Sequence, residues 1–439
     1  MAKKDVWANP PKEKPRIVIP EAAFREKRAQ TAEAEEEKLP RVSLPGAVKA
    51  LFHEKWNCLC YNSRNESIVF RHEPPCDTGH TKFPAELTDE DFTSIVCEFR
   101  KEGFALGYEN AVKAALRVST MHSFDPVKEY LEGLEWDGVR RLEVFLAACF
   151  GAAVDLDATP DEQAREAKWI STISAKWPIG AVARVYDPGC QVDNVLIAES
   201  PLQGTRKSSA FRALAVHDEW FASNLPDIHS KDSVHHLLGP WIIELDELDA
   251  LNRKEATSIK GFISRRVDRA RLSYRKSTSN YPRRVIFCGS TNEDTYNTDA
   301  TGGRRFWPFR VRETIRVDLI EQWRDQIWAE AVHRYKAGEK WWLDDTELED
   351  IAREEQSKRF KGGVHLDAIR QYLERNSTEA VSIDDILSEL GIPTENRHQM
   401  HQNEAARALQ HLGWTRRRVT VKGKRAWRYV KSVLADSGP

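Results

Sequence analysis

The stretch VLIAESPLQGTRKSSAFRALAV, residues 195–216, decides the fold class of this chain. Its first six residues form an apolar, β-rich run, and KSSAFRALAV, which begins at Lys207, reads as a helix. A strand, a tight loop and a helix that starts at Lys-Ser are the arrangement of a phosphate-binding loop, in which main-chain N–H groups and a helix N-terminus surround the phosphates. We therefore predict that Lys207 reaches the β- and γ-phosphates of ATP and that the Ser208 hydroxyl ligates Mg²⁺.

The loop departs from the pattern G-x-x-x-x-G-K-[ST] at two positions. Pro201 stands where the first glycine belongs, and Arg206 stands where the second belongs. Glycine at these positions lets the backbone approach phosphate closely and accepts unusual dihedral angles. The Arg206 side chain either crowds the site, faces outward or reaches toward phosphate. The predicted cofactor-binding set consists of Gly204, Thr205, Lys207, Ser208 and Ser209.

Acidic and polar residues follow two further apolar runs. PWIIELDELDAL, residues 240–251, predicts a strand that ends in carboxylates, with Glu244 or Asp246 near the metal and Glu247 as the base that polarises the attacking water. The alternative is a strand with solvated acids at its exit. PRRVIFCGSTNED, residues 282–294, predicts another buried strand, after which Asn292 would orient water and the γ-phosphate. The metal set is thus Ser208, Glu244 and Asp246.

Clustered arginines point to two more roles. TGGRRFWPFRV, residues 301–311, places Arg304 and Arg305 on a glycine-rich turn, where such a pair can be supplied to a neighbouring subunit's site; the alternative is a solvated surface turn. KGFISRRVDRARLSYRKSTSNYPRR, residues 260–284, mixes cations with tyrosines, which suits phosphate neutralisation and base stacking, unless it is merely a solvated helix face. The DNA contacts expected here are Arg265, Arg266, Arg271, Tyr274, Arg275 and Lys276.

Composition bounds the class of protein. Hydrophobic residues make up 41% of the 439 residues and charged residues 31%, which is ordinary for a soluble globular protein. No apolar run reaches the length of a membrane span, so we expect no membrane partner and a cytoplasmic location. Seven scattered cysteines favour reduced thiols. A zinc site formed by Cys58, Cys60, Cys76 and His80 is the less favoured alternative to small buried thiols.

Changes in composition and hydrophobic pattern along the chain predict five segments. They are a flexible arm at 1–45, a small accessory α+β domain at 46–120, a helical region at 121–190, an ATPase core at 191–360 and a C-terminal unit at 361–439. The last unit resembles a winged helix: DAIRQYLERN (367–376), SIDDILSELGI (382–392, with Ser382 as N-cap) and NEAARALQHLGW (403–414) read as helices, and TRRRVTVKGKRAWRYV (415–430) as two strands. Between Ala405 and Lys431 there are nine Lys/Arg and no acid. The expected phosphate contacts are Arg407, Arg416, Arg417, Arg418, Lys422, Lys424 and Arg425.

The chain also resembles the virulence-associated protein E family, a phage and genomic-island branch of superfamily 3-like ATPases. The resemblance rests on FDPVKEYLEGLEWDGVRRLEVFL (124–146), IGAVARVYDPGCQVDNVLIAESPLQGTRKSS (179–209), PDIHSKDSVHHLLGPWIIELDELDAL (226–251) and STNEDTYNTDATGGRRFWPFRV (290–311). It spans about residues 120–345, and Gly204, Thr205, Lys207 and Ser208 carry over onto the family's Gly-Thr-Gly-Lys-Ser loop.

This resemblance implies an α/β P-loop NTPase core in a hexameric or otherwise ring-like DNA helicase that helps start replication of a mobile element. The residue 260–284 interval would then supply the hairpin that touches single-stranded DNA in the channel, while the C-terminal unit binds duplex. The segment before residue 120 is too short for a primase module, so a separate primase or replication initiator is an expected partner. The competing hypothesis is a degenerate NTPase that binds DNA as a regulator without hydrolysing ATP, and Arg206 is the feature that favours it.

Overall fold

The computed structural model describes residues 39–52, 54–223, 231–245, 253–271, 277–293, 305–359, 366–376, 380–394, 397–421 and 424–431. The chain divides into two compact units. Among the described residues, the first unit comprises 39–61 and 67–123, and the second comprises 62–66 and everything from Phe124 onward. Most of the arm predicted at 1–45 lies outside the described residues.

The first unit is a small α+β assembly. Its helices are α2 (Leu44–Leu51), α3 (Asp89–Lys101) and α4 (Tyr108–Ser119), and its sheet has the order β3-β2-β1-β4, formed by β1 (Leu59–Asn62), β2 (Ser67–Phe70), β3 (Ala85–Glu86) and β4 (Ser123–Phe124). Helix α3 begins where it does because Thr88 and Asp91 form a reciprocal capping box. Helix α2 begins at Leu44, inside the range predicted as the arm.

The cysteines proposed as the alternative zinc site lie in this unit's interior. Cys58, Cys60 and Cys76 are buried, and burial raises the pKa of the Cys58 thiol to about 12 and that of Cys76 to about 11. His80 instead contacts the Asp91 carboxylate at 3.0 Å. Within the described residues, no group of three or more His, Cys, Asp or Glu is arranged to hold a metal ion. These cysteines are small buried thiols.

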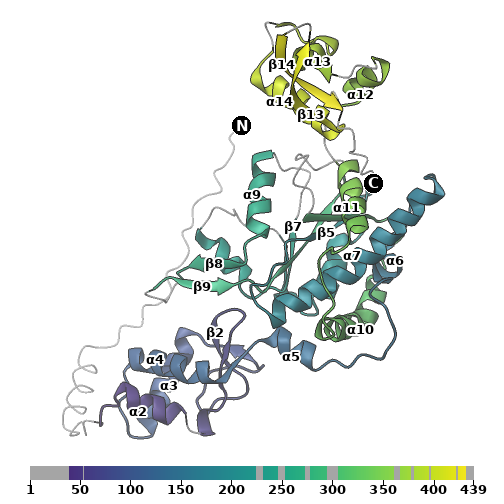
Figure 1. Ribbon diagram of the computed structural model, residues 1–439. Coiled ribbons are helices and arrows are strands. Elements are labelled where there is room, and N and C mark those ends of the chain that lie inside the picture. Colours follow the sequence, from purple (N-terminus) through teal and green to yellow (C-terminus); the bar gives the residue numbers. More distant parts are fainter. Residues whose placement is uncertain are drawn as a thin grey trace, which may run out of the picture. The chain divides into compact units, whose positions relative to one another are not determined.

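A five-stranded parallel sheet forms the centre of the second unit (Figure 1). Its order is β11-β5-β10-β7-β6, and every adjacent pair runs parallel. The strands are β5 (Val195–Glu199), β6 (Phe221–Ser223), β7 (Ile242–Leu245), β10 (Ile286–Thr291) and β11 (Phe306–Arg310). Strands β5, β7 and β10 coincide with the three apolar runs identified in the sequence, and the parallel sheet confirms an α/β fold. The three-residue β6 was not predicted.

Both faces of this sheet are covered, which explains why its strands are apolar at nearly every position. Leu196 and Ala198 of β5 pack into the larger core with helices α7 (Pro160–Tyr186), α8 (Lys207–Leu214) and α10 (Val317–Lys336). Val195 and Ile197, which alternate with them, pack on the opposite face with the end of α9 (Arg253–Ile263). The remaining helices of this region are α5 (Pro126–Glu132), α6 (Phe145–Phe150) and α11 (Thr346–Lys358).

Buried indoles fix the helices to the sheet. Trp169 and Trp177 of α7 donate hydrogen bonds to the carbonyl oxygens of Pro308 at 2.8 Å and Phe287 at 2.9 Å. Trp328 of α10 donates to the carbonyl oxygen of Leu214, at the end of α8, at 2.9 Å. Because each indole N–H has an acceptor, these large rings are buried without leaving a donor unsatisfied. The same contacts hold α8 in place beside the strands.

An antiparallel hairpin, β8 (Val267–Ala270) with β9 (Ser279–Pro282), separates α9 from β10. Not every cation of the basic 260–284 run faces solvent. Arg283 is buried and makes a bidentate ion pair with Asp268, at 2.6 and 2.9 Å, and Lys260 is also buried. Arg283 therefore serves the packing of the hairpin base, and Lys260, in α9, lies over the ring of Phe306.

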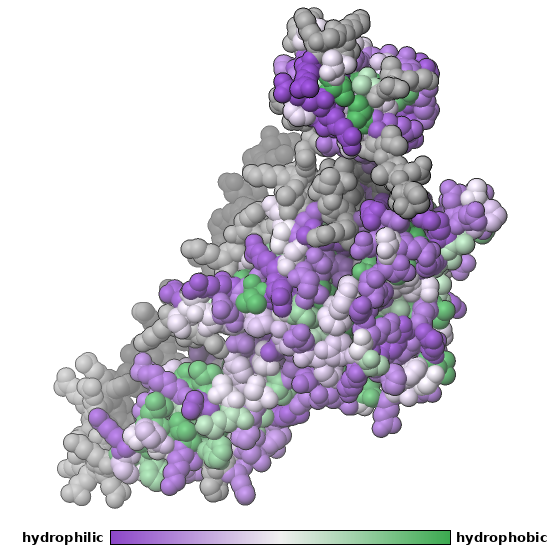
Figure 2. Space-filling view, in the orientation of Figure 1, coloured by the Kyte–Doolittle hydropathy of each residue, from purple (hydrophilic) through white to green (hydrophobic). Residues whose placement is uncertain are grey.

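The C-terminal elements run in the order α12 (Leu366–Arg375), β12 (Ala380–Val381), α13 (Ile383–Glu389), α14 (Gln399–His411), β13 (Trp414–Val421) and β14 (Lys424–Lys431). The strands form an antiparallel sheet of order β12-β14-β13. Ser382 caps α13 in a reciprocal box with Asp385, which confirms the predicted N-cap. Trp414 and Tyr429 are buried against the helices. Hydrophilic residues predominate on the face of these elements that Figure 2 shows.

The described helices include none with both the length and the apolar character needed to cross a bilayer.

Candidate functional site

The loop between β5 and α8 has the backbone conformation that the sequence pattern anticipates. Gly204 has φ +75°, and Arg206 has φ 64° and ψ 26°, so both lie in the left-handed region. Glycine enters this region freely, whereas a residue with a Cβ is strained there. The structure thus explains why a glycine is expected immediately before Lys207. The Arg206 side chain is exposed. Of the three orientations considered for it, the structure therefore disfavours the one in which it is buried in the loop and crowds the site.

Helix α8 offers its N-terminus to the loop. The first N–H groups of any helix have no acceptor within the helix, and here no side-chain hydrogen bond from Arg206 caps them. These amides and the helix dipole favour an anion at this point. Lys207, the first residue of α8, is buried, whereas Ser208 and Ser209 are exposed.

Lys207 connects the loop to the strand beside β5. Its Nζ donates a hydrogen bond of 2.8 Å to Oδ1 of Asn292, the residue that follows β10. Strands β5 and β10 are parallel and adjacent, so their carboxyl ends lie at the same edge of the sheet. A buried ammonium and a side-chain amide therefore share this edge.

Ser208 connects the loop to the acidic strand. Its Oγ donates a hydrogen bond of 2.9 Å to Oε1 of Glu244 in β7. The Glu244 side chain is fully buried, although the rest of β7 is apolar. A buried carboxylate with a serine hydroxyl beside a helix N-terminus supplies oxygen ligands of the kind Mg²⁺ binds together with phosphate. Asp246 and Glu247, the other acids of this prediction, lie outside the described residues.

Thr205 offers a further indication that the loop is shaped for a ligand. Its Oγ1 is buried and has no hydrogen-bond partner among the described residues. Buried polar atoms usually have partners, because leaving one unsatisfied costs about 1–3 kcal/mol. With the Lys207 ammonium, the amides of α8 and the Ser208–Glu244 pair, the donor set fits a nucleotide phosphate and a magnesium ion.

Arg305 lies at the other edge of the sheet. It precedes β11, and its guanidinium contacts Ser264 Oγ at 2.7 Å and Asp193 at 3.3 Å, near the start of β5. In a parallel sheet the starts of the strands are opposite the edge that holds Lys207 and Asn292. Arg305 therefore does not reach this chain's own loop, and its predicted role requires a second subunit. Arg304 lies outside the described residues.

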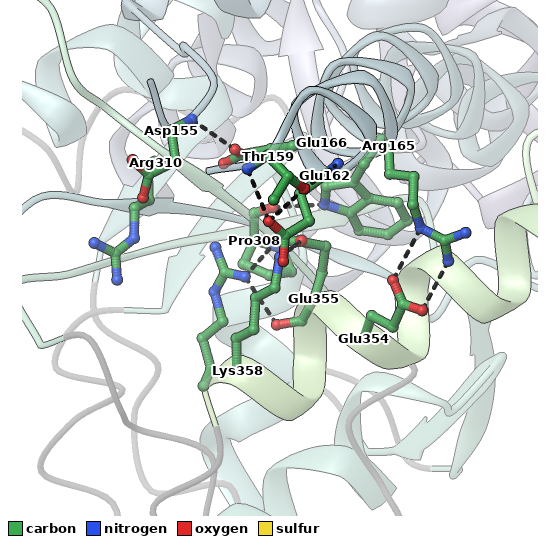
Figure 3. A network of polar contacts seen from close by, with 12 residues as sticks. Asp155, Thr159, Glu162, Arg165, Glu166, Pro308, Arg310, Glu354, Glu355 and Lys358 are labelled. Carbon is green, nitrogen blue, oxygen red and sulfur yellow. Dashed lines mark hydrogen bonds and ion pairs between the residues drawn. The ribbon is translucent and has the colours of Figure 1, made fainter. Parts of the chain in front are cut away.

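A buried ion-pair network beneath the loop was not identified in the sequence. Glu199, the last residue of β5, accepts hydrogen bonds from Arg359 at 2.8–3.1 Å, and both side chains are almost fully buried. Arg359 also pairs with Glu355 of α11, and Arg310 lies 3.9 Å from Glu199. Burial opposes ionisation of Glu355, but Arg359 and Lys358 outweigh this and keep its pKa below the ordinary value. Figure 3 shows this region where α11 meets α7 and β11.

The network fixes the strand from which the loop emerges. One signal in the sequence could have revealed it: a carboxylate ends an otherwise apolar strand and therefore needs a buried partner. That partner is 160 residues away along the chain, so its identity could not be read from local pattern.

The predicted DNA-contacting residues of the hairpin are only partly described. Arg265, Arg266 and Arg271 are exposed, although Arg266 Nε donates to the carbonyl oxygen of Gly189 at 2.7 Å. The other three predicted residues of this segment, Tyr274, Arg275 and Lys276, lie outside the described residues.

The predicted DNA contacts of the C-terminal unit lie mostly on its strands. Exposed side chains on β13 and β14 belong to Arg416, Arg417, Arg418 and Arg425. Arg407 and Lys424 lie in α14 and β14, but their side chains are not described, and Lys422 lies outside the described residues.

Comparison with known proteins gives one family and several distant structural likenesses. No curated protein matches. "The apo structure of NrS-1 C terminal region (305-718)" matches with 13% identity and a TM-score of 0.40, over 90% of this chain and 99% of that chain. "The A form apo structure of NrS-1 C terminal region-CTR(305-718)" matches with 12% identity and a TM-score of 0.43, over 85% and 95%. The family model described as "Virulence-associated protein E-like domain" matches residues 131–361, just over half of the chain. This chain therefore belongs to the virulence-associated protein E-like domain family.

Proposed function

We propose that this chain is an ATP-dependent DNA helicase or translocase that acts in the replication of phage or mobile-element DNA. The observation that carries the proposal is the pair of contacts at one edge of the parallel sheet, Lys207 with Asn292 and Ser208 with Glu244. They connect a loop of the phosphate-binding type to a carboxylate, Glu244, and to a side-chain amide, Asn292, which are groups that nucleotide hydrolysis uses. Membership of the virulence-associated protein E-like family adds the association with mobile elements that the sequence resemblance implied.

Each side chain has a defined part in this proposal. Lys207 and the amides at the start of α8 bind the phosphates, and the Lys207–Asn292 contact positions the amide beside them. Ser208 and Glu244 would hold Mg²⁺, which when bound neutralises phosphate charge during transfer. Glu247 would accept the proton of the attacking water. Arg305, at the opposite edge of the sheet, would complete the site of the next subunit, so the active form is a homo-oligomeric ring, with six subunits expected.

DNA is the proposed substrate track. Exposed Arg265 and Arg271 flank strand β8 of the β8–β9 hairpin, which would contact a single strand in the ring channel. The helix and strand order of the C-terminal unit, α-β-α-α-β-β, supports a winged helix, which would bind duplex DNA. A separate primase or replication initiator is a further partner in this proposal.

The proposal is tested by ATP hydrolysis with and without single-stranded DNA. We expect the wild-type chain to hydrolyse ATP and DNA to stimulate the rate. A wild-type chain that binds DNA but does not hydrolyse ATP, with activity appearing only in Arg206→Gly, would establish the regulatory alternative instead. That alternative is favoured by one observation, the strained left-handed backbone at Arg206.

Replacing Arg206 with glycine is expected to stabilise the fold slightly and to raise the rate of hydrolysis. The change removes a left-handed strain of roughly 1–2 kcal/mol. This gain is partly offset by about 0.5–1 kcal/mol, because glycine has more freedom in the unfolded chain and loses it on folding. Glu66→Gly is the matched control, because Glu66 has φ 61° but lies outside the loop. Urea denaturation should show a similar small gain for both variants, while only Arg206→Gly hydrolyses ATP faster. Equal rates in wild type and Arg206→Gly would contradict a catalytic effect of this residue.

A further inference from the structure

The β13–β14 ribbon carries an aromatic residue that its own fold does not use. Trp427 of β14 is 56% exposed, whereas Trp414 and Tyr429, the other two aromatic residues of the ribbon, are each 6% exposed. Burying an indole is favourable by a few kcal/mol, so a fold that buries two aromatic rings of one ribbon and leaves the third outside gains nothing from that third ring. Tryptophan is enriched at interfaces, because its ring combines a large apolar face with a polar N–H group.

The register of the ribbon places cations around this indole. Arg418 is directly opposite Trp427, and Arg425 is opposite Thr420. Cross-strand partners and residues two positions apart share a face of the sheet, so Trp427 lies on one face with Arg416, Arg418 and Arg425. All three arginines are exposed. This face continues outward from the buried pair of Trp414 and Tyr429.

Arg416 holds the indole in place. Its guanidinium carbon lies 5.0 Å from the centre of the Trp427 ring, within the range of a cation–π contact. Arg428, on the other face, is paired with Asp385 at 2.7 Å and is therefore engaged within the fold. Because no acid occurs between Ala405 and Lys431, the ribbon offers no carboxylate to repel a polyanion. A positioned aromatic ring among cations is the arrangement that binds single-stranded nucleic acid.

We infer that Trp427 is a stacking platform for an unpaired DNA base, with Arg418 and Arg425 contacting the phosphates on either side. The faces of bases within a duplex are covered by their neighbours, so this surface selects a strand that is already open. The inference rests on the proposed DNA-binding function and changes it at one point: the ribbon binds a single strand, as at a replication junction, in addition to any duplex contact made by α14.

The test measures binding of the full chain to a fluorescein-labelled oligothymidylate of about 16 nucleotides, close to the upper site size of such surfaces. The same strand with a central run of abasic sites retains the phosphates but lacks bases. The variants are Trp427→Ala, Trp427→Phe and Arg418→Ala. Trp342→Ala is the matched control, because Trp342 is also exposed, at 47%, and also has a cation over its ring, the Lys340 ammonium at 5.9 Å.

We expect Trp427→Ala to bind the base-bearing strand about tenfold more weakly, with Trp427→Phe close to wild type and Trp342→Ala unchanged. On the abasic strand, Trp427→Ala should equal wild type. Arg418→Ala should weaken binding to both strands and lower the salt dependence of log K by about 0.7. A 5-iodouracil strand should crosslink to the peptide that contains Trp427.

Each contrary result has a distinct meaning. The stacking role is overturned if Trp427→Ala binds the base-bearing and abasic strands as wild type does, or loses the same affinity for both. In that case, weaker binding by Arg418→Ala would still support the DNA-binding function. If Trp427→Ala loses more affinity for a duplex of the same length than for the single strand, the assignment of an unpaired base is overturned. If none of the variants alters binding and no crosslink forms, both the inference and DNA binding by this unit fail.

Discussion

Replacement of Lys207 by alanine is expected to lower ATP hydrolysis about 100-fold or more. The side chain is the one buried ammonium that the described loop residues 200–209 contribute, and catalysis of phosphoryl transfer consists mainly of positioning and charge stabilisation. The same variant should lose the increase in melting temperature that ATP and Mg²⁺ give the wild-type chain, because a ligand stabilises only the state that binds it.

A matched control separates this effect from general damage. Lys340→Ala removes a lysine whose side chain is 53% exposed in a surface ion pair with Asp344, and it should leave hydrolysis and nucleotide-induced stabilisation unchanged. Circular dichroism should give the same helix content for both variants. If Lys207→Ala hydrolyses ATP as fast as the wild-type chain, the loop is not part of the ATP site.

The second large effect is expected at Arg359. Arg359→Met leaves the Glu199 carboxylate in a buried position without its principal counter-charge, which typically lowers the free energy of unfolding by about 3–5 kcal/mol. Arg165→Met removes the similarly bidentate but exposed pair with Glu354 and should cost no more than about 1 kcal/mol. Urea denaturation followed by tryptophan fluorescence measures both.

The double variant Glu199→Gln with Arg359→Met identifies the cause. If Arg359→Met is destabilised because the buried Glu199 carboxylate has no counter-charge, neutralising Glu199 should recover part of the lost free energy of unfolding. The destabilisations of the two single variants should then not add in the double variant. Because Glu199 is the residue directly before the loop, Arg359→Met should also weaken ATP binding, whereas Arg165→Met should not. Equal destabilisation by the two arginine variants would contradict a special role for the buried pair.

The sequence predicted the parts of the site that depend on local pattern. Apolar runs with a polar residue at or after their carboxyl ends predicted β5, β7 and β10, and a parallel sheet necessarily brings such ends to one edge. The contacts of Lys207 with Asn292 and of Ser208 with Glu244 follow from that rule. The N-cap at Ser382 was equally local and was found as predicted.

Features that depend on distant partners could not be predicted in this way. The pairing of Glu199 with Arg359 joins residues far apart in the chain, and the burial of Arg283 depends on how the hairpin packs against α9. In both cases the local sequence indicates an exposed charged side chain, because burial becomes evident only when the partner is known. The strain at Arg206 lies between these cases: the missing glycine was visible, but only the backbone shows that a left-handed conformation is retained there.

The central claim is that the edge formed by the loop, Glu244 and Asn292 binds the phosphates of ATP. A crystal structure of the chain with Mg²⁺ and a non-hydrolysable ATP analogue tests it most directly. We predict the triphosphate at the N-terminus of α8 in contact with Lys207, and the metal beside Ser208 and Glu244. An analogue bound elsewhere in the chain, with the Lys207–Asn292 and Ser208–Glu244 contacts undisturbed, would contradict it.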